Sequence, residues 1–292
     1  MTHIRFGPSG NSDLFYERGY KSSLQAPKWL HSLGLDAYEY SFGRGVRLGE
    51  EKASLIGKEA KFYDVQLSVH LPYYINLAAE EPDKRERNIV YFLESLKAAK
   101  AMGAVRAVFH PGSASKNTRE FNLAAAERFL KEIIGIIDEN GYRDIVLCPE
   151  TTGKLNQLGN LEEVAELCAV DERLLPAVDF AHLHCRGKGC IKGKRDFIEI
   201  FDYLLNRLGE YRTSNMHIHF SRVEFTAGGE KMHHRLCDVQ YGPEFLPLAE
   251  LLFERKMSPV VICESKGTMA EDAVSMMEMY RSFHKEQNSI VD

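Results

Sequence analysis

The sequence predicts a single (β/α)8 TIM barrel over residues 1–292, on three observations. The chain has 292 residues, 44% of them hydrophobic, which suits one α/β barrel of roughly 250 residues better than two small domains. Short β-rich runs alternate with longer segments whose apolar residues recur at three- and four-residue spacing. The alternation occurs eight times, and eight strand and helix units with right-handed crossovers close a parallel barrel.

Each strand is expected where a brief run of β-branched, aromatic or other apolar residues occurs. The strand candidates are His3 to Gly7, Ala37 to Tyr40, Gln66 to His70, Val105 to His110, Asp144 to Glu150, Leu175 to Asp179, Asn215 to Phe220 and Pro259 to Glu264. The helical patterns lie near residues 24 to 33, 48 to 62, 83 to 102, 118 to 139, 161 to 169, 194 to 208, 243 to 255 and 269 to 284. Pro82 and Asp83 before the third helix, and Gly141 after the fourth, are typical boundary signals.

Six short apolar runs along the chain stop on a histidine or a carboxylate. The strand-end residues of these runs are His70, His110, Glu150, Asp179, His217 and Glu264. Because neighbouring parallel strands of a barrel end on the same face, the six side chains would meet there. Histidine nitrogen and carboxylate oxygen are the usual ligands of zinc and related ions, and a carboxylate can bridge two ions.

Further histidines extend this series. His182 follows Asp179 by three residues where a strand passes into a loop or helix, so both can face one cavity. His233 and His234 lie in the longest irregular stretch, about residues 221 to 241, and a loop of that length is usually functional. On the seventh strand, period-two alternation puts His217 and His219 on one face, so either could face the barrel mouth.

Each of these residues alone has a structural explanation. A single strand-end histidine is more often a hydrogen-bonded core residue than a ligand. Asp179 could cap a following helix, and Glu150 or Glu264 could close a salt bridge in the barrel. Six such side chains at matching strand ends are hard to obtain from independent accidents, so the conjunction favours a metal site.

Composition restricts the compartment and the partners. The N-terminus carries no basic stretch before an apolar core, and nowhere do about 18 apolar residues run together, so neither a secretory signal nor a membrane span is expected. Six cysteines without a C-x-x-C pair predict reduced thiols in a cytoplasmic protein, and no obligate protein partner is evident. A net charge of -5 argues against coating of nucleic acid by global charge. The basic run from Arg186 to Arg195 is typical of either a local phosphate-binding patch or a solvated loop.

Several segments of the chain resemble, in order, those of the endonuclease IV family. The segments are HLPYYINLA (residues 70–78), FHPGSAS (109–115), PETTGKLNQLGN (149–160), VDFAH (178–182), MH (216–217), HH (233–234) and ICES (262–265). The family consists of metal-dependent apurinic/apyrimidinic endonucleases with a xylose isomerase-like barrel. The match runs from about residue 60 to 270, and its first two segments are fairly specific.

The resemblance implies a cluster of zinc ions that activates water for attack on the phosphodiester 5′ to an abasic site in duplex DNA. His70, His110 and Glu150 would hold the first ion, and Glu150 would be the catalytic bridge to a second. Asp179, His217 and Glu264 would complete the second ion's set, and His182 and His233 would belong to a third. Two or three Zn²⁺ ions are expected, and Mn²⁺ is an alternative. Tyr73 matches a family tyrosine that props the DNA near the lesion.

The chain departs from the family pattern at several positions. Lys231 stands where the family has the aspartate of the third ion, and a protonated ammonium is not a ligand. Glu230 or His219 could substitute, or Lys231 could act as a fixed charge beside a two-metal site. The loop after the second strand also differs from the family's DNA-probing loop and supplies Arg44, which with Arg186 is a candidate DNA contact.

Two other functions stay open. A sugar isomerase or epimerase on the same barrel would use one divalent ion held by Glu150, Asp179, His217 and Glu264. Such an enzyme would leave the remaining histidines without an obvious role. A non-catalytic binder of damaged DNA would keep the cleft and bind lesions without incision.

Overall fold

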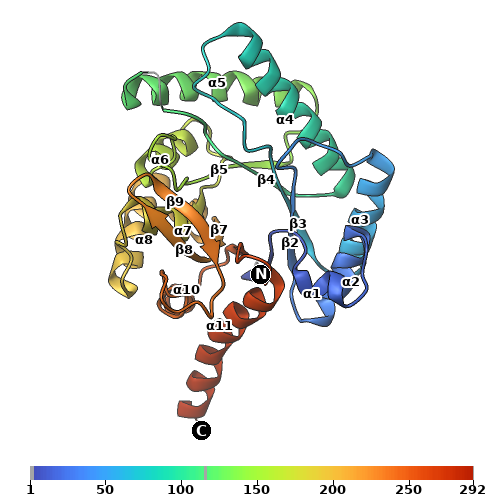
Figure 1. Cartoon of the computed structure of the whole chain (residues 1–292), viewed down its shortest axis with the longest axis vertical. Helices are drawn as coiled ribbons and strands as arrows, with labels where there is room; N and C mark the ends of the chain where they lie inside the picture. Colours follow the sequence, from blue (N-terminus) through green and yellow to red (C-terminus); the bar gives the residue numbers. More distant parts are fainter. Residues whose placement is uncertain (1–2, 115–116, 292) are drawn as a thin grey trace.

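The computed structural model describes residues 3–114 and 117–291 and the side chains as far as residue 284, so Ser115 of the FHPGSAS segment lies outside the described residues. Eight parallel strands form the centre of the molecule and a ring of helices surrounds them (Figure 1). The strands are β1 (Arg5–Pro8), β2 (Ala37–Ser41), β3 (Gln66–His70), β4 (Arg106–Phe109), β5 (Val146–Pro149), β6 (Ala177–Asp179), β7 (His217–Phe220) and β10 (Val260–Cys263). All eight predicted strands are confirmed, mostly with shorter bounds.

The strands pair in two halves that meet to close the barrel. One half has the order β1-β10-β7-β6 and the other β2-β3-β4-β5, with every pair parallel. Parallel bridges from Ser9 to Glu39 and from Glu150 to Ala177 join the halves at their two seams. The predicted (β/α)8 barrel is therefore confirmed, and the carboxyl ends of all eight strands lie on one face.

The seam between β1 and β2 depends on a glycine. A Cβ at Gly7 would lie 1.8 Å from the carbonyl oxygen of Ala37, so no larger residue fits without moving a strand. On the same seam Gly10 donates its backbone N–H to the carbonyl of Glu39 at 2.9 Å. This close approach holds β2, and with it Glu39, against the end of β1.

Eight main helices cover the barrel and confirm the predicted helical segments. They are α2 (Ala26–Ser32), α3 (Glu50–Phe62), α4 (Pro82–Met102), α5 (Arg119–Glu139), α6 (Leu161–Ala169), α8 (Lys194–Leu208), α10 (Leu246–Glu254) and α11 (Met269–Val291). The start of α6 shows how the sequence sets a boundary. The Asn160 side chain accepts the backbone N–H of Glu163 at 2.7 Å, and the Glu163 carboxylate accepts that of Asn160 at 3.0 Å, which satisfies free amides of the first turn. No described helix is long and apolar enough to cross a membrane.

Further short elements were not predicted. They are α1 (Asp13–Glu17), the 3-10 helix Ser23–Gln25, α7 (Phe180–Arg186), α9 (Glu210–Ser214), β8 (Arg222–Thr226) and β9 (Gly229–His234). The last two fall in the stretch expected to be irregular and form an antiparallel hairpin that packs against α7. Figure 1 shows this hairpin in orange beside α7.

Candidate metal centre

Metal-type side chains gather at and just below the carboxyl ends of the strands in four groups. Within each group, potential ligand atoms of all members lie within 4.8 Å of one another. The groups are His70, His110 and Glu150; Glu150, Asp179, His219 and Glu264; Asp179, His182 and His233; and Glu39, His217 and His219. The first three groups are continuous, because Glu150 belongs to the first and second and Asp179 to the second and third.

The first group is built on Glu150, which follows β5 and is almost completely buried. Its Oε2 atom lies 2.9 Å from Nε2 of His70 and 2.9 Å from Nε2 of His110. The other ring nitrogen of His70, Nδ1, lies 2.8 Å from the carbonyl oxygen of Leu71. Since a carbonyl only accepts, Nδ1 carries the proton, and in the neutral ring Nε2 keeps its lone pair for an ion.

The second group contains a buried oxygen atom that has no hydrogen-bond partner among the described residues, Oδ2 of Asp179. The other oxygen of Asp179 accepts the backbone N–H of His182 at 2.7 Å, which caps α7. Nδ1 of His219 lies 2.7 Å from Glu150 and 3.5 Å from Glu264. A fully buried carboxylate oxygen without a donor is costly unless a cation neutralises it, so this group fits a bound ion.

The third group adds a residue of the hairpin, Glu230. His182 donates Nδ1–H to the carbonyl of Thr151 at 2.8 Å, and its Nε2 lies 3.4 Å from Oε2 of Glu230. Nε2 of His233 lies 3.5 Å from Oε1 of the same carboxylate, and its Nδ1 lies 2.7 Å from the hydroxyl of Ser221. Glu230 thus supplies a carboxylate beside the two histidines.

A β-bulge at Lys231 explains this arrangement. In the hairpin register Glu224 pairs with Met232 and Phe225 pairs with Glu230, so Lys231 has no opposite residue. The extra residue shifts the alternation, and two residues three apart, Glu230 and His233, both face the site. Lys231 points away, more than half exposed, with Nζ 2.6 Å from Glu224. Of the possibilities the sequence left open here, the structure brings Glu230 to the histidines, and Lys231 does not enter the site.

The structure brings together seven of the eight predicted ligands and sets His217 apart. His217 lies one layer deeper in the barrel, completely buried, with Nε2 3.0 Å from Glu39. Burial lowers the pKa of His217 to about 4, so its ring is neutral at pH 7. His219 stands in the second group where the sequence placed His217. Glu39 and Glu230 were not among the predicted site residues; a lone acid inside the apolar strand AYEYS was the available signal for Glu39.

Without a bound cation, protons on the histidines balance the charge of these carboxylates. Burial would lower the pKa of His70, but its contact with Glu150 raises it to about 9. Burial likewise opposes protonation of His182, whereas Asp179 and Glu230 raise its pKa to about 10. Burial would raise the pKa of Glu150, yet His219 and His110 hold it well below its usual value. The centre therefore has the charge balance of a site in which cations replace protons.

The three predicted DNA contacts lie in different settings. Tyr73 follows β3 and is 54% exposed, and Arg44 is exposed on the loop after β2. The two loops meet, since a Cβ at Gly43 would contact the ring of Tyr73. Arg186 is instead committed to the protein: its guanidinium donates to the carbonyls of Thr152, Lys154 and Gln157 at 2.8–3.0 Å.

Comparison with known proteins defines the class. The profile of the xylose isomerase-like TIM barrel family matches residues 27–283, and the chain belongs to this family. An uncharacterised protein of Methanocaldococcus jannaschii is 33% identical over 262 residues, which cover 89% of this chain and 92% of that protein. A probable endonuclease 4 of Mycoplasmoides gallisepticum is 28% identical over 204 residues, which cover 68% of this chain and 63% of that protein.

Solved structures agree on the fold. Endonuclease IV from Thermus thermophilus superposes with a TM-score of 0.68 at 20% identity, covering 97% of this chain and 99% of that one. A D-tagatose 3-epimerase-like protein superposes with a TM-score of 0.72 at 19% identity, covering 99% of this chain and 100% of that one. The structural likeness therefore extends to an endonuclease and to a sugar epimerase-like protein, and the ligand set has to distinguish between them.

Proposed function

We propose that this protein is a zinc-dependent phosphodiesterase that cleaves duplex DNA on the 5′ side of abasic sites, with Mn²⁺ as an alternative metal. The observation that carries the proposal is the continuity of the three ligand groups. Glu150 and Asp179 are each shared by two groups, which is the arrangement that holds adjacent ions. The segment resemblance and the similarity to probable endonucleases 4 support the choice of substrate.

The residues present fit two or three divalent ions. Ions held there would lower the pKa of a water molecule and neutralise charge on the attacking and leaving oxygens of the phosphate. Glu150 fixes the spacing of the first two positions, because its Oε2 contacts His70 and His110 while its Oε1 contacts His219. Its proposed catalytic role is therefore to hold the ligands of the first two metal positions at a fixed separation.

The exposed residues beside the centre suit contact with DNA. The ring of Tyr73 is half exposed near the loop that carries the cation of Arg44, and an aromatic face can stack on bases unpaired at a lesion. Arg186 supports the strand-end loop that follows Glu150, so it acts on DNA binding only through the shape of that loop.

The test measures metal content per chain and incision of a duplex that carries one abasic analogue. The comparison is between the native protein and Glu150→Gln, with Glu166→Gln as the matched control, because Glu166 pairs with Arg207 on the outer helices. Two or three ions and incision that requires Glu150 are expected. Lesion binding without incision at any zinc or manganese concentration would instead indicate a DNA-damage binder.

A second candidate function is a one-metal sugar isomerase or epimerase. The second group alone, with three carboxylates and His219, has the oxygen-rich composition that suits Mg²⁺ or Mn²⁺ at one position. This function predicts one ion per chain, no incision, and interconversion of keto-sugars that stops in Glu264→Gln. The same metal count separates the two functions.

A further inference from the structure

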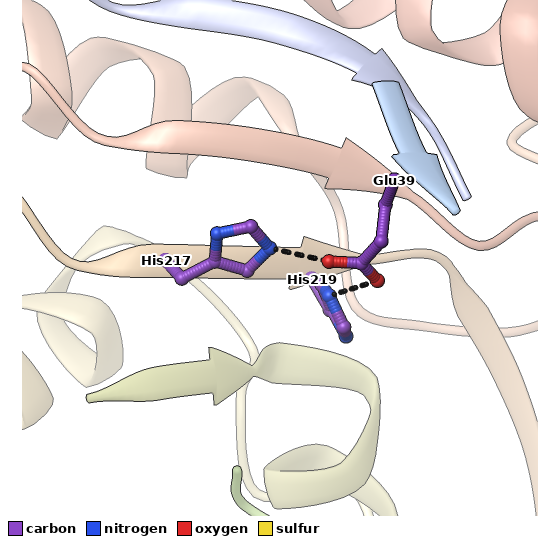
Figure 2. A group of neighbouring side chains, drawn as sticks. All are labelled: Glu39, His217 and His219. Carbon is purple, nitrogen blue, oxygen red and sulfur yellow. Dashed lines mark ion pairs between the residues drawn. The ribbon is translucent and has the colours of Figure 1, made fainter. Parts of the chain in front are cut away.

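The fourth group consists of three completely buried side chains, Glu39, His217 and His219 (Figure 2). Oε2 of Glu39 lies 3.0 Å from Nε2 of His217, and Oε1 lies 3.0 Å from Nε2 of His219. The hydroxyl of Ser68 on β3 also donates to Oε2 at 3.0 Å. One carboxylate on β2 therefore meets donors from two other strands.

His219 belongs to both this group and the metal centre. Its Nε2 faces Glu39, and its Nδ1 faces Glu150 at 2.7 Å and Glu264 at 3.5 Å. A neutral imidazole has one N–H and one lone pair, so a proton on Nε2 leaves the lone pair of Nδ1 directed into the second ligand group.

We propose that Glu39 is a positioning residue that fixes the tautomer and the ring orientation of His219, so that Nδ1 is held ready for the second ion. The inference rests on the proposed metal centre, in which Glu39 would contact a ligand and not an ion. A carboxylate that accepts a hydrogen bond from the far N–H of a ligating histidine orients the ring and raises its basicity. His217 and Ser68 in turn hold Glu39.

The geometry distinguishes this role from a fourth ion site. An ion between Glu39 and His217 would also need Nε2 of His219, whose Nδ1 already faces the second group. The same ring would then ligate two ions and lose both of its protons. The contacts of Glu39 with the Nε2 atoms of both histidines at 3.0 Å need no such step, although Nδ1 of His217 has no hydrogen-bond partner among the described residues.

The test compares native protein with Glu39→Gln, which keeps the size of the side chain and removes its charge. Ions per chain are counted at saturation, affinity is measured by competition with a chromophoric chelator, and visible absorption is recorded with Co²⁺ in place of zinc. The thermal midpoint of the metal-free protein is recorded separately, because a purely structural role would change that midpoint alone. We expect an unchanged ion count, one ion bound about tenfold to hundredfold more weakly, and a shifted Co²⁺ spectrum.

Two results would overturn the inference. Affinity and spectrum equal to those of the native protein would leave Glu39 a purely structural residue, and a loss of one ion at saturation would show that Glu39 is itself a ligand. If Glu39→Gln does not fold, the variants His217→Gln and His217→Leu are compared instead. His217→Gln keeps an N–H donor to Glu39 and should bind the ion more tightly than His217→Leu. Equal affinities of these two variants would contradict the proposal. If the native protein binds no divalent ion, the proposed function itself fails, which is a distinct outcome.

Discussion

Replacing Glu230 with glutamine tests whether the hairpin completes the third ligand position. The carboxylate lies 3.4 Å from His182 and 3.5 Å from His233, and its side chain is 23% exposed. Hydrogen bonds to charged groups contribute about 1.5–3 kcal/mol each, and these two long contacts at a partly exposed site contribute about 1–2 kcal/mol together. In metal-free protein the substitution should therefore lower the thermal midpoint by a few degrees, at roughly 2 °C per kcal/mol.

In the metal-loaded protein the same substitution removes a candidate ligand. We expect one ion to bind at least about tenfold more weakly, since even outer-layer partners of a metal site contribute that much. The assay is chelator competition combined with ion counting. Glu224→Gln is the matched control, because Glu224 lies on the same hairpin and pairs with Lys231 on the outer side. Equal ion affinities in the two variants would refute the assignment of Glu230.

Three further predictions concern stability and DNA binding. Glu150 raises the pKa of His70 to about 9 against the effect of burial. The proton on His70 therefore stabilises the metal-free fold fully below pH 6.5, and this contribution is lost as pH rises through 9. A free energy of unfolding that does not change between pH 6.5 and 9 would contradict this prediction. Tyr73→Ala should weaken binding to a lesion duplex by about 1–3 kcal/mol in a fluorescence anisotropy titration, whereas Tyr211→Ala, also an exposed tyrosine but on α9, should not. Arg186→Ala should lower the free energy of unfolding by about 3 kcal/mol, because three carbonyls lose a charged donor, while Arg44→Ala should weaken DNA binding without a loss of stability; the opposite pattern would restore Arg186 as a direct DNA contact.

The barrel could be predicted because its strands are buried on both sides. Such strands are continuous apolar runs separated by amphipathic helices, and all eight were found from this pattern alone. The hairpin β8–β9 could not be found in the same way. Its strands carry Glu224, Lys231 and other polar residues, and they pack on α7 instead of lying in the central sheet, so the apolar alternation is weak.

The sequence identified the strands that carry the ligands, but it did not identify every ligating side chain. The end of the apolar run SNMH and the family resemblance both pointed to His217, but alternation allowed either histidine of MHIHF. Only the register of β7 with β6 puts His219 beside Asp179. The bulge at Lys231 is likewise a property of strand pairing, which a single sequence does not reveal. Glu39 was missed because its role depends on contacts with His217 and His219 of β7, which lie far from it in the sequence and meet it only in the folded barrel.

The proposed function depends most on Glu150, which would hold the positions of two ions side by side. Anomalous scattering at the zinc edge from crystals grown with zinc tests it most directly. We predict two peaks about 3.5–4 Å apart on either side of the Glu150 carboxylate, the separation typical of two-metal phosphodiesterase sites. A single peak among Glu150, Asp179, His219 and Glu264, with none beside His70 and His110, would contradict the account and favour the one-metal sugar enzyme.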